Sequence, residues 1–156
     1  MTAHIALRPV AHADFAVLYE QQLDPGATRM AVFPARDWAA FETHWTKILA
    51  DPTVVARVIV ENGRVAGNIV VWGQPAERLV GYWIGREHWG KGIATATLAL
   101  LLEDVADRPL LAHVAKTNVG SIRVLEKCGF TVSGENLATV PGGADAVEEW
   151  IMRLDR

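Results

Sequence analysis

The chain has 156 residues, a net charge of −3 and 51% hydrophobic residues, which predicts one domain over 1–156 with a sizeable core. Its charges are interleaved and its apolar runs are short, so neither a nucleic-acid footprint nor a membrane surface or span is expected. The start lacks a signal-peptide pattern and Cys128 is the one cysteine, which together favour a cytoplasmic protein without a disulfide framework.

Hydrophobic periodicity and turn signals divide the first half of the chain into strands and helices. A period of two in HIALRPV predicts a strand, and apolar residues spaced three or four apart after Asp37 predict a capped helix that ends before Pro52. Asn62-Gly63 joins two β-branched runs and is typical of a hairpin. The elements expected here are a strand at 4–10, a helix at 13–23, a helix from 38, and strands at 53–61, 64–72 and 79–85.

The second half is expected to hold a helix from about 93 to 106, a strand at 110–115, a helix within 118–130, and strands at 130–135 and 148–155. The order is therefore βααβββαβαββ, an α/β (α+β) fold with a mixed, mostly antiparallel sheet of about seven strands and helices on both faces. The central strand–helix–strand unit needs a right-handed crossover, so its two strands are expected to be parallel. A ligand would bind beyond the carboxyl ends of those two strands.

Residues 88–95, HWGKGIAT, place two glycines in front of a helix. The first amides of a helix have no partner within it and carry a partial positive charge, so an anion such as a phosphate would satisfy them. Gly90 and Gly92 would let the backbone approach that anion closely. The loop is neither a Walker loop nor a GxGxxG fingerprint, since Thr95 occupies the place of the third glycine. By itself it fits a tight turn as well as an anion site.

Taken with NVGSIRVLEKCGF at 118–130, the loop GKGIAT resembles the two signature segments of the GNAT acyl-CoA N-acyltransferases. With YWIG before the loop, the likeness points to the branch that includes the ribosomal-protein N-terminal acetyltransferases. The resemblance covers nearly the whole chain and implies the GNAT fold, in which the parallel pair of strands is splayed. It does not indicate the acceptor, since one family serves many acceptors.

The resemblance implies acetyl-CoA as the co-substrate, without a metal, and its pyrophosphate would be held by the amides of the loop. Lys91 would add charge, and Trp89 stands where the family commonly has Gln or Arg. The acetyl-bearing arm would lie in the splay, where a backbone amide near Trp83 or Ile84 would polarise the thioester carbonyl. The residues expected to bind the co-substrate are Trp83, Ile84, Trp89, Gly90, Lys91, Gly92, Ile93, Ala94, Thr95, Asn118, Ser121 and Arg123.

Moving an acetyl group from sulfur to nitrogen requires a neutral amine, a polarised carbonyl and a proton for the departing thiolate. Leu125 replaces the tyrosine proton donor of many relatives, and the resemblance suggests Ser121 instead, although a solvated serine fits equally well. Asn118 is expected to cap its helix and, by resemblance, to contact the pantetheine arm. Because Leu79 replaces a frequent glutamate base, His113 is a candidate base, with a packed structural histidine as the alternative.

Glu20 on the first helix and His44 on the second are further candidate bases, as is a chain of water molecules. The resemblance places the acceptor between these helices, the 79–85 strand and the last hairpin. Alternation puts Tyr82 and Trp83 on opposite faces, so at most one faces the acceptor, and Asp24 would attract a cationic amine. The candidate acceptor-binding residues, for which packing in the core is the alternative, are Arg29, Met30, Phe33, His44, Trp45 and Tyr82.

Three functions fit these patterns. The first two are acetyl transfer by direct attack in a ternary complex, either to a small-molecule amine or to a protein N-terminal α-amine. The third is a non-catalytic acyl-CoA-binding or sensing domain, since leucines stand at the usual base and acid positions. Cys128, at the end of a helix beside Gly129, is expected to pack rather than act as a nucleophile. A monomer and a homodimer both remain open.

Overall fold

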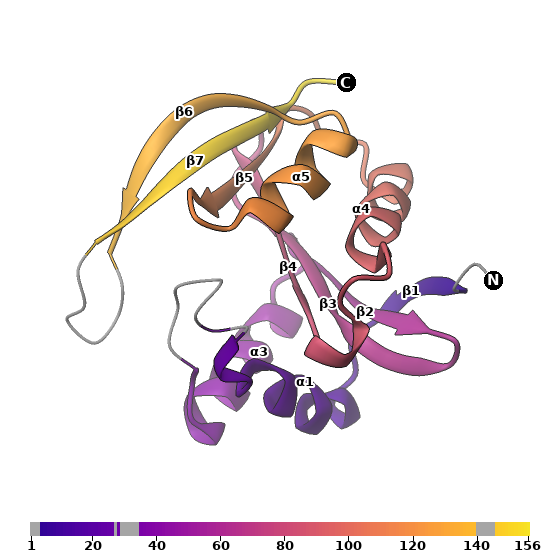
Figure 1. Ribbon diagram of the computed structural model, residues 1–156. Coiled ribbons are helices and arrows are strands. Elements are labelled where there is room, and N and C mark those ends of the chain that lie inside the picture. The colour runs from indigo at the N-terminus through magenta and orange to yellow at the C-terminus, as the bar shows by residue number, and fades with distance from the viewer. Residues whose placement is uncertain (1–3, 27, 29–34, 140–145) are drawn as a thin grey trace.

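The computed structural model describes residues 4–26, 28, 35–139 and 146–156, and a seven-stranded sheet runs through it (Figure 1). The strands are β1 (Ile5–Pro9), β2 (Val55–Glu61), β3 (Arg64–Trp72), β4 (Arg78–Ile84), β5 (Leu110–Ala115), β6 (Thr131–Ala138) and β7 (Val147–Leu154). They lie in the order β1-β2-β3-β4-β5-β7-β6. The helices are α1 (Phe15–Gln22), α3 (Trp38–Ala50), α4 (Ile93–Asp104) and α5 (Val119–Lys127), with short 3₁₀ turns η1 (His12–Asp14) and η2 (Arg86–His88). The expected order of strands and helices is confirmed.

The helix cap and the hairpin turn that the sequence predicts are both present. The Asp37 carboxylate accepts a hydrogen bond from the Ala40 amide at 2.8 Å and so caps α3. Asn62 and Gly63 both have positive φ, +50° and +84°, which matches the right-handed twist of the β2–β3 hairpin. The last hairpin is longer than expected, since β6 continues to Ala138 where it pairs with β7.

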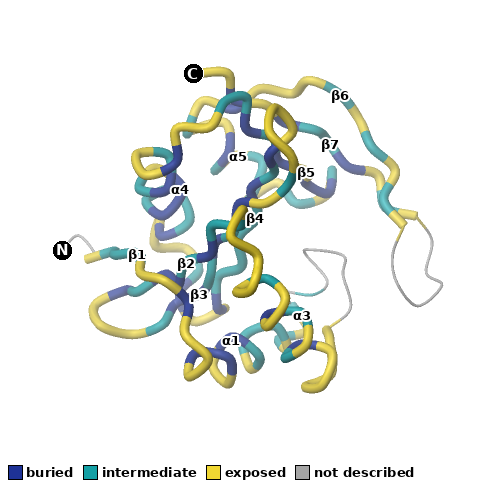
Figure 2. Tube along the Cα trace, turned by 180° about the vertical axis from the view of Figure 1, so that it is seen from behind, coloured by how far each residue is buried: buried dark blue, intermediate teal, exposed yellow. Residues whose placement is uncertain are grey.

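Two apolar clusters cover the two faces of the sheet. Neighbouring β2 residues belong to different clusters: Val58 packs with Phe15 and Trp45 from α1 and α3, whereas Ile59 packs with Leu98 from α4. Each fully buried side chain of this size contributes about 1.5–3 kcal/mol relative to an exposed one. Figure 2 shows buried positions along β2 and β3, while β6, at the sheet edge, is exposed or intermediate throughout. None of the helices in the described part of the chain has the length and hydropathy needed to cross a membrane.

β4 and β5 are the parallel pair, and they separate soon after they meet. Their register covers only Arg78 with Leu110 and Leu79 with Leu111. Beyond that point β4 continues along β3, and β5 continues along β7. A β-carbon on Gly67 of β3 would lie 2.0 Å from the Trp83 carbonyl oxygen, so glycine is needed for the close approach of β3 to β4. The early separation of β4 from β5 is the splay expected from the family resemblance.

Candidate functional site

The glycine loop leads directly into α4, whose first amides have no side-chain cap. Gly92 is the N-cap residue, and Gly90 and Gly92 both have a φ of +74°, a left-handed conformation that favours glycine. The Ala96 amide donates to the Gly92 carbonyl at 3.1 Å, so helix geometry leaves the amides of residues 93–95 without an acceptor inside the helix. A β-carbon on either glycine would meet no described atom within 4 Å. The space in front of the loop is therefore open.

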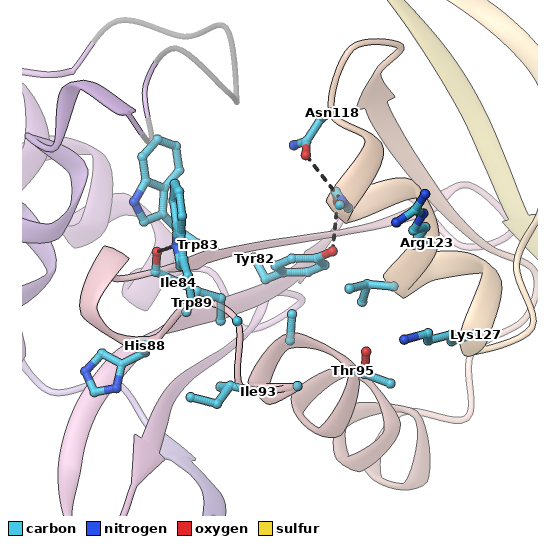
Figure 3. A pocket seen from close by; sticks show the side chains of 16 residues that line it. Tyr82, Trp83, Ile84, His88, Trp89, Ile93, Thr95, Asn118, Arg123 and Lys127 are labelled. Carbon is cyan, nitrogen blue, oxygen red and sulfur yellow. Dashed lines mark hydrogen bonds between the residues drawn. The ribbon is translucent and has the colours of Figure 1, made fainter.

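A cavity of about 450 Å³ opens between this loop, β4 and the start of α5 (Figure 3). Its lining among the described residues is Tyr82, Trp83, Ile84, His88, Trp89, Gly90, Gly92, Ile93, Ala94, Thr95, Asn118, Gly120, Ser121, Arg123, Val124 and Lys127. The structure thus brings together all the residues expected to bind the co-substrate except Lys91. Their binding role stays a prediction.

Lys91 is directed away from the cavity, toward the end of β2. Its Nζ lies 3.8 Å from the Glu61 carboxylate, which also pairs with Nδ1 of the buried His88. These contacts tie the glycine loop to the β2–β3 hairpin. The basic side chains that line the cavity are instead Arg123 and Lys127, one turn apart on α5. Sequence reasoning missed Lys127, although its spacing of four from Arg123 could have indicated a shared helix face.

Two tryptophans form hydrogen bonds near the C-terminal end of β4. The Trp89 indole donates to the Ile84 carbonyl at 2.9 Å, and the Arg86 guanidinium lies 5.5 Å from the centre of the Trp89 ring. The Trp83 indole donates to the Gln21 carbonyl of α1 at 3.2 Å. The Trp83 side chain therefore packs toward α1, and the hydrogen bond of Trp89 fixes the strand end beside the loop.

A chain of hydrogen bonds connects β4 with the start of α5 (Figure 3). The Asn118 side chain accepts from the Ser121 amide at 3.2 Å, so Asn118 is the predicted N-cap. The Ser121 hydroxyl lies 2.8 Å from the Tyr82 hydroxyl. Burial raises the pKa of Tyr82, while the bond to Ser121 opposes that effect and the nearby Cys128 adds to it. Leu125 is buried in the core and presents no polar group.

A second cavity, of about 570 Å³, lies between α1, α3, β3 and β4. His44 and Trp45 line it, together with other aromatic, polar and charged residues that include Arg36, Phe41, Lys47, Asp51, Asn68 and Trp72. Tyr82 and Trp83 line both cavities. The pKa of His44 is lowered, mainly by burial and further by the charges of Arg36 and Lys47. The two cavities therefore share the splayed part of β4, while the Tyr82 side chain itself packs on the α4 side of the sheet.

The remaining candidates lie elsewhere. Arg29, Met30 and Phe33 are outside the described residues. His113 lines neither cavity, and its Nδ1 lies 3.8 Å from the Glu149 carboxylate. The lining residues of the two cavities do not include Glu20, Asp24 or Cys128 either.

Asp24 lies 3.4 Å from the Arg86 guanidinium. Burial raises the pKa of the Cys128 thiol, which disfavours the thiolate that a nucleophile needs. The geometry of the site thus gives no support to a covalent role for this cysteine.

The comparison with protein families identifies the family to which this chain belongs. A sequence model described as the acetyltransferase (GNAT) domain matches residues 4–131. The chain belongs to the GNAT acetyltransferase family. Among the residues matched are the glycine loop, the splayed strands and all of α5, so this GNAT domain includes the first cavity.

Individual relatives agree with this family. The probable N-acetyltransferase YjcK of Bacillus subtilis (strain 168) is 37% identical over 70 residues, which cover 42% of this chain and 38% of that protein. A structure of RimL, a ribosomal L7/L12 α-N-protein acetyltransferase with coenzyme A, superposes with a TM-score of 0.84 at 17% identity, covering 97% of this chain and 93% of that one.

The spermidine N-acetyltransferase from Vibrio cholerae, in complex with CoA and spermine, has a TM-score of 0.83 at 17% identity, with 97% and 95% covered. At such identities both structures show that the GNAT fold is shared.

Proposed function

We propose that this GNAT protein is an acetyl-CoA-dependent N-acetyltransferase in which an amine attacks the acetyl group directly within a ternary complex. The observation that carries the proposal is the pair of cavities that flank the splayed strand β4 and have Tyr82 and Trp83 in common in their linings. One cavity holds the donor and the other the acceptor, so the reacting atoms would meet at β4. A domain that only binds acyl-CoA would need the first cavity alone.

The first cavity suits coenzyme A because its groups match an anionic, extended ligand. The uncapped amides of residues 93–95 would bind the pyrophosphate at the positive end of α4. Arg123 and Lys127 would add positive charge from α5. RimL and the spermidine acetyltransferase were both solved with CoA, which supports the same ligand here.

The chemistry follows from the groups at the junction. The amine nitrogen attacks the thioester carbon, a C–N bond forms, and a backbone amide near Trp83 or Ile84 stabilises the charge on the carbonyl oxygen. The C–S bond then breaks, the Ser121 hydroxyl gives the departing sulfur its proton, and the proton that the attacking nitrogen loses returns to the Ser121 oxygen through water. Asn118 holds Ser121 in place through the backbone of the helix start.

The second cavity favours an acceptor with an apolar body and no additional positive charge. Phe41 and Trp45 supply an aromatic wall, and Arg36 and Lys47 are cationic. Asp51 is the one carboxylate among the described lining residues, and it accepts hydrogen bonds from the Thr53 amide and hydroxyl at 2.9 and 2.7 Å. A polyamine would therefore meet more repulsion than attraction, whereas an amine that carries an anionic group, or a peptide N-terminus, would not.

Titration calorimetry with CoA tests the donor site. Gly92→Glu places a carboxylate beside the expected pyrophosphate and strains a φ of +74°, so we expect it to abolish measurable binding. Gly63→Glu is the matched control, because Gly63 has a φ of +84° and equally open surroundings, but lies in the distant β2–β3 hairpin. Unaltered CoA affinity in Gly92→Glu would contradict the proposal.

Free-thiol release from acetyl-CoA, measured over a panel of amines, tests the acceptor. The panel contains spermidine, aromatic and aliphatic monoamines, amino acids and N-terminal peptides. We expect kcat/KM for the best apolar amine to exceed that for spermidine by about tenfold or more, roughly 1.4 kcal/mol of discrimination. Tight CoA binding without acceptor-dependent release would instead indicate a binding or sensing domain.

A further inference from the structure

Two cationic side chains line the second cavity from its exposed side. Arg36 and Lys47 are both exposed, and Lys47 follows His44 by one turn of α3. The backbone of Arg36 is held at the end of α1, because its amide donates to the Gln22 side chain at 2.8 Å and that side chain donates back to the Arg36 carbonyl at 2.9 Å. The pKa of His44 is lowered mainly by burial and then by the charges of Arg36 and Lys47, so both cations act on the same part of the cavity.

The described carboxylates leave this positive charge uncompensated. The ion pairs among the described residues include neither Arg36 nor Lys47. Asp51 is the one carboxylate among the described lining residues, and it already accepts hydrogen bonds from the amide and the hydroxyl of Thr53. The mouth of the cavity therefore suits an anion.

The sheet side of the same cavity is uncharged. Asn68 of β3 pairs with Trp83 of β4, so the two side chains lie on the same face of the sheet. The Trp72 ring lies over Gly81, 3.2 Å from the place where a β-carbon would stand. All four residues line the cavity, and the Asn68 carboxamide oxygen can accept a hydrogen bond from an amine. A neutral amine therefore suits the sheet side.

We propose that the acceptor is an amine that also carries an anionic group. Arg36 and Lys47 bind the anionic group at the mouth of the second cavity, and the amine lies at the sheet, beside Asn68 and β4. Phe41 and Trp45 contact the apolar body between the two ends. The inference rests on the proposed acetyl transfer and names its acceptor class, since a second cation on the acceptor would be repelled where an anion is attracted.

Three amines of the same shape test the charge preference. 4-(Aminomethyl)benzoate, 4-methylbenzylamine and 1,4-bis(aminomethyl)benzene differ only in the group opposite the amine, which is anionic, neutral or cationic. We expect kcat/KM to fall in that order, with about three- to tenfold between the first two, because exposed charge pairs contribute modestly. 6-Aminohexanoate, hexylamine and 1,6-diaminohexane repeat the comparison at a greater separation of the two groups. Equal kcat/KM values within both sets, or the diamines as best acceptors, would overturn the proposal.

Reversal of charge at the mouth assigns the preference to Arg36 and Lys47. In Arg36→Glu and in Lys47→Glu the diamine should become a better acceptor than the aminomethylbenzoate. Arg64→Glu is the matched control, since Arg64 is exposed in the β2–β3 hairpin, lines neither cavity and should keep the original order. The preference of the unmodified protein should also shrink at high salt. An unchanged order in both cavity variants would contradict binding of the anionic group by these cations.

Asn68→Leu tests the orientation of the acceptor. This substitution removes the carboxamide and keeps a similar shape, so kcat/KM should fall by about three- to tenfold for all three aromatic amines alike, with their order unchanged. Loss of the charge preference in Asn68→Leu would show that the anionic group, and not the amine, lies at the sheet.

A ligand without an amine tests anion binding apart from catalysis. 4-Methylbenzoate should raise the pKa of His44 in an NMR titration, because its carboxylate offsets the charges of Arg36 and Lys47, whereas 4-methylbenzyl alcohol should not. The His44 signal is assigned by its loss in His44→Gln. An unchanged His44 pKa at saturating 4-methylbenzoate would contradict the anion site. The proposed function fails separately, if no amine releases thiol from acetyl-CoA.

Discussion

At the scale of single residues, Asp14 links β1 to the start of α1. Its carboxylate accepts two hydrogen bonds from Arg8 at 2.8 Å each and one from the Ala11 amide at 2.8 Å. The bond from Arg8 lowers the pKa of Asp14 most, burial opposes this, and the Ala11 amide and the Arg8 charge lower it further. Because the pKa of Asp14 is lower in the folded than in the unfolded state, its carboxylate stabilises the fold at pH values above the unfolded-state pKa. That stabilisation is lost as the pH falls through the folded-state pKa.

We therefore expect Asp14→Asn to lower the free energy of unfolding by about 1–3 kcal/mol at pH 7, measured by urea denaturation. The difference should shrink once pH falls below about 4. Asp155→Asn is the control, since its pair with Arg153 is exposed and should contribute at most about 0.5 kcal/mol. A difference between Asp14→Asn and the unmodified protein that is independent of pH would contradict this role of the carboxylate.

At the scale of elements, the basic residues of the glycine loop and of α5 point to different surroundings. Lys91 pairs with Glu61 behind the loop, whereas Lys127 lines the first cavity, the proposed donor site, from α5. We expect Lys127→Met to weaken CoA binding about three- to tenfold, roughly 1 kcal/mol, because an exposed charge contributes modestly to anion binding. Lys91→Met makes the same change on the other side of the loop, and its CoA affinity should stay within about twofold.

Calorimetry at low and high salt checks this division. The loss in Lys127→Met should diminish at high salt, because exposed charges are screened. An equal loss of affinity in Lys91→Met would show that its ammonium turns into the cavity when CoA binds.

At the scale of the whole molecule, two cavities that flank one strand would allow both substrates of the proposed reaction to be bound at once. Initial rates measured against both substrates should therefore give intersecting double-reciprocal lines. Cys128 lines neither cavity and has a raised pKa, so Cys128→Ser should keep kcat within about twofold. Parallel lines, or an acetyl group trapped on Cys128, would indicate a covalent intermediate and contradict direct transfer.

Much of the fold was predictable because its signals are short-range. The period of two in the strands, the caps Asp37 and Asn118 and the Asn62-Gly63 turn act over a few residues, and each is present in the structure. The glycine loop was recognisable for the same reason. The helix of residues 118–130 likewise showed that Asn118 and Ser121 share one turn.

The direction of individual side chains was not predictable in this way. Lys91 follows Gly90 in the motif, yet its ammonium faces Glu61, because the left-handed glycines and the buried His88 turn that side of the loop toward β2. Tyr82 was expected on the acceptor side, but alternation along β4 specifies only that it opposes Trp83. Its hydrogen bond joins residues 39 positions apart, which no local pattern contains.

The sequence by itself determined the order of strands and helices, the parallel crossover and the glycine-led start of α4, since each depends on neighbouring residues and backbone preferences. Only the tertiary structure decided that Tyr82 meets Ser121 and that the two cavities share β4. Those contacts depend on how far β4 and β5 diverge and on which helix packs against which face. Both are set by the packing of the two apolar clusters rather than by any single segment.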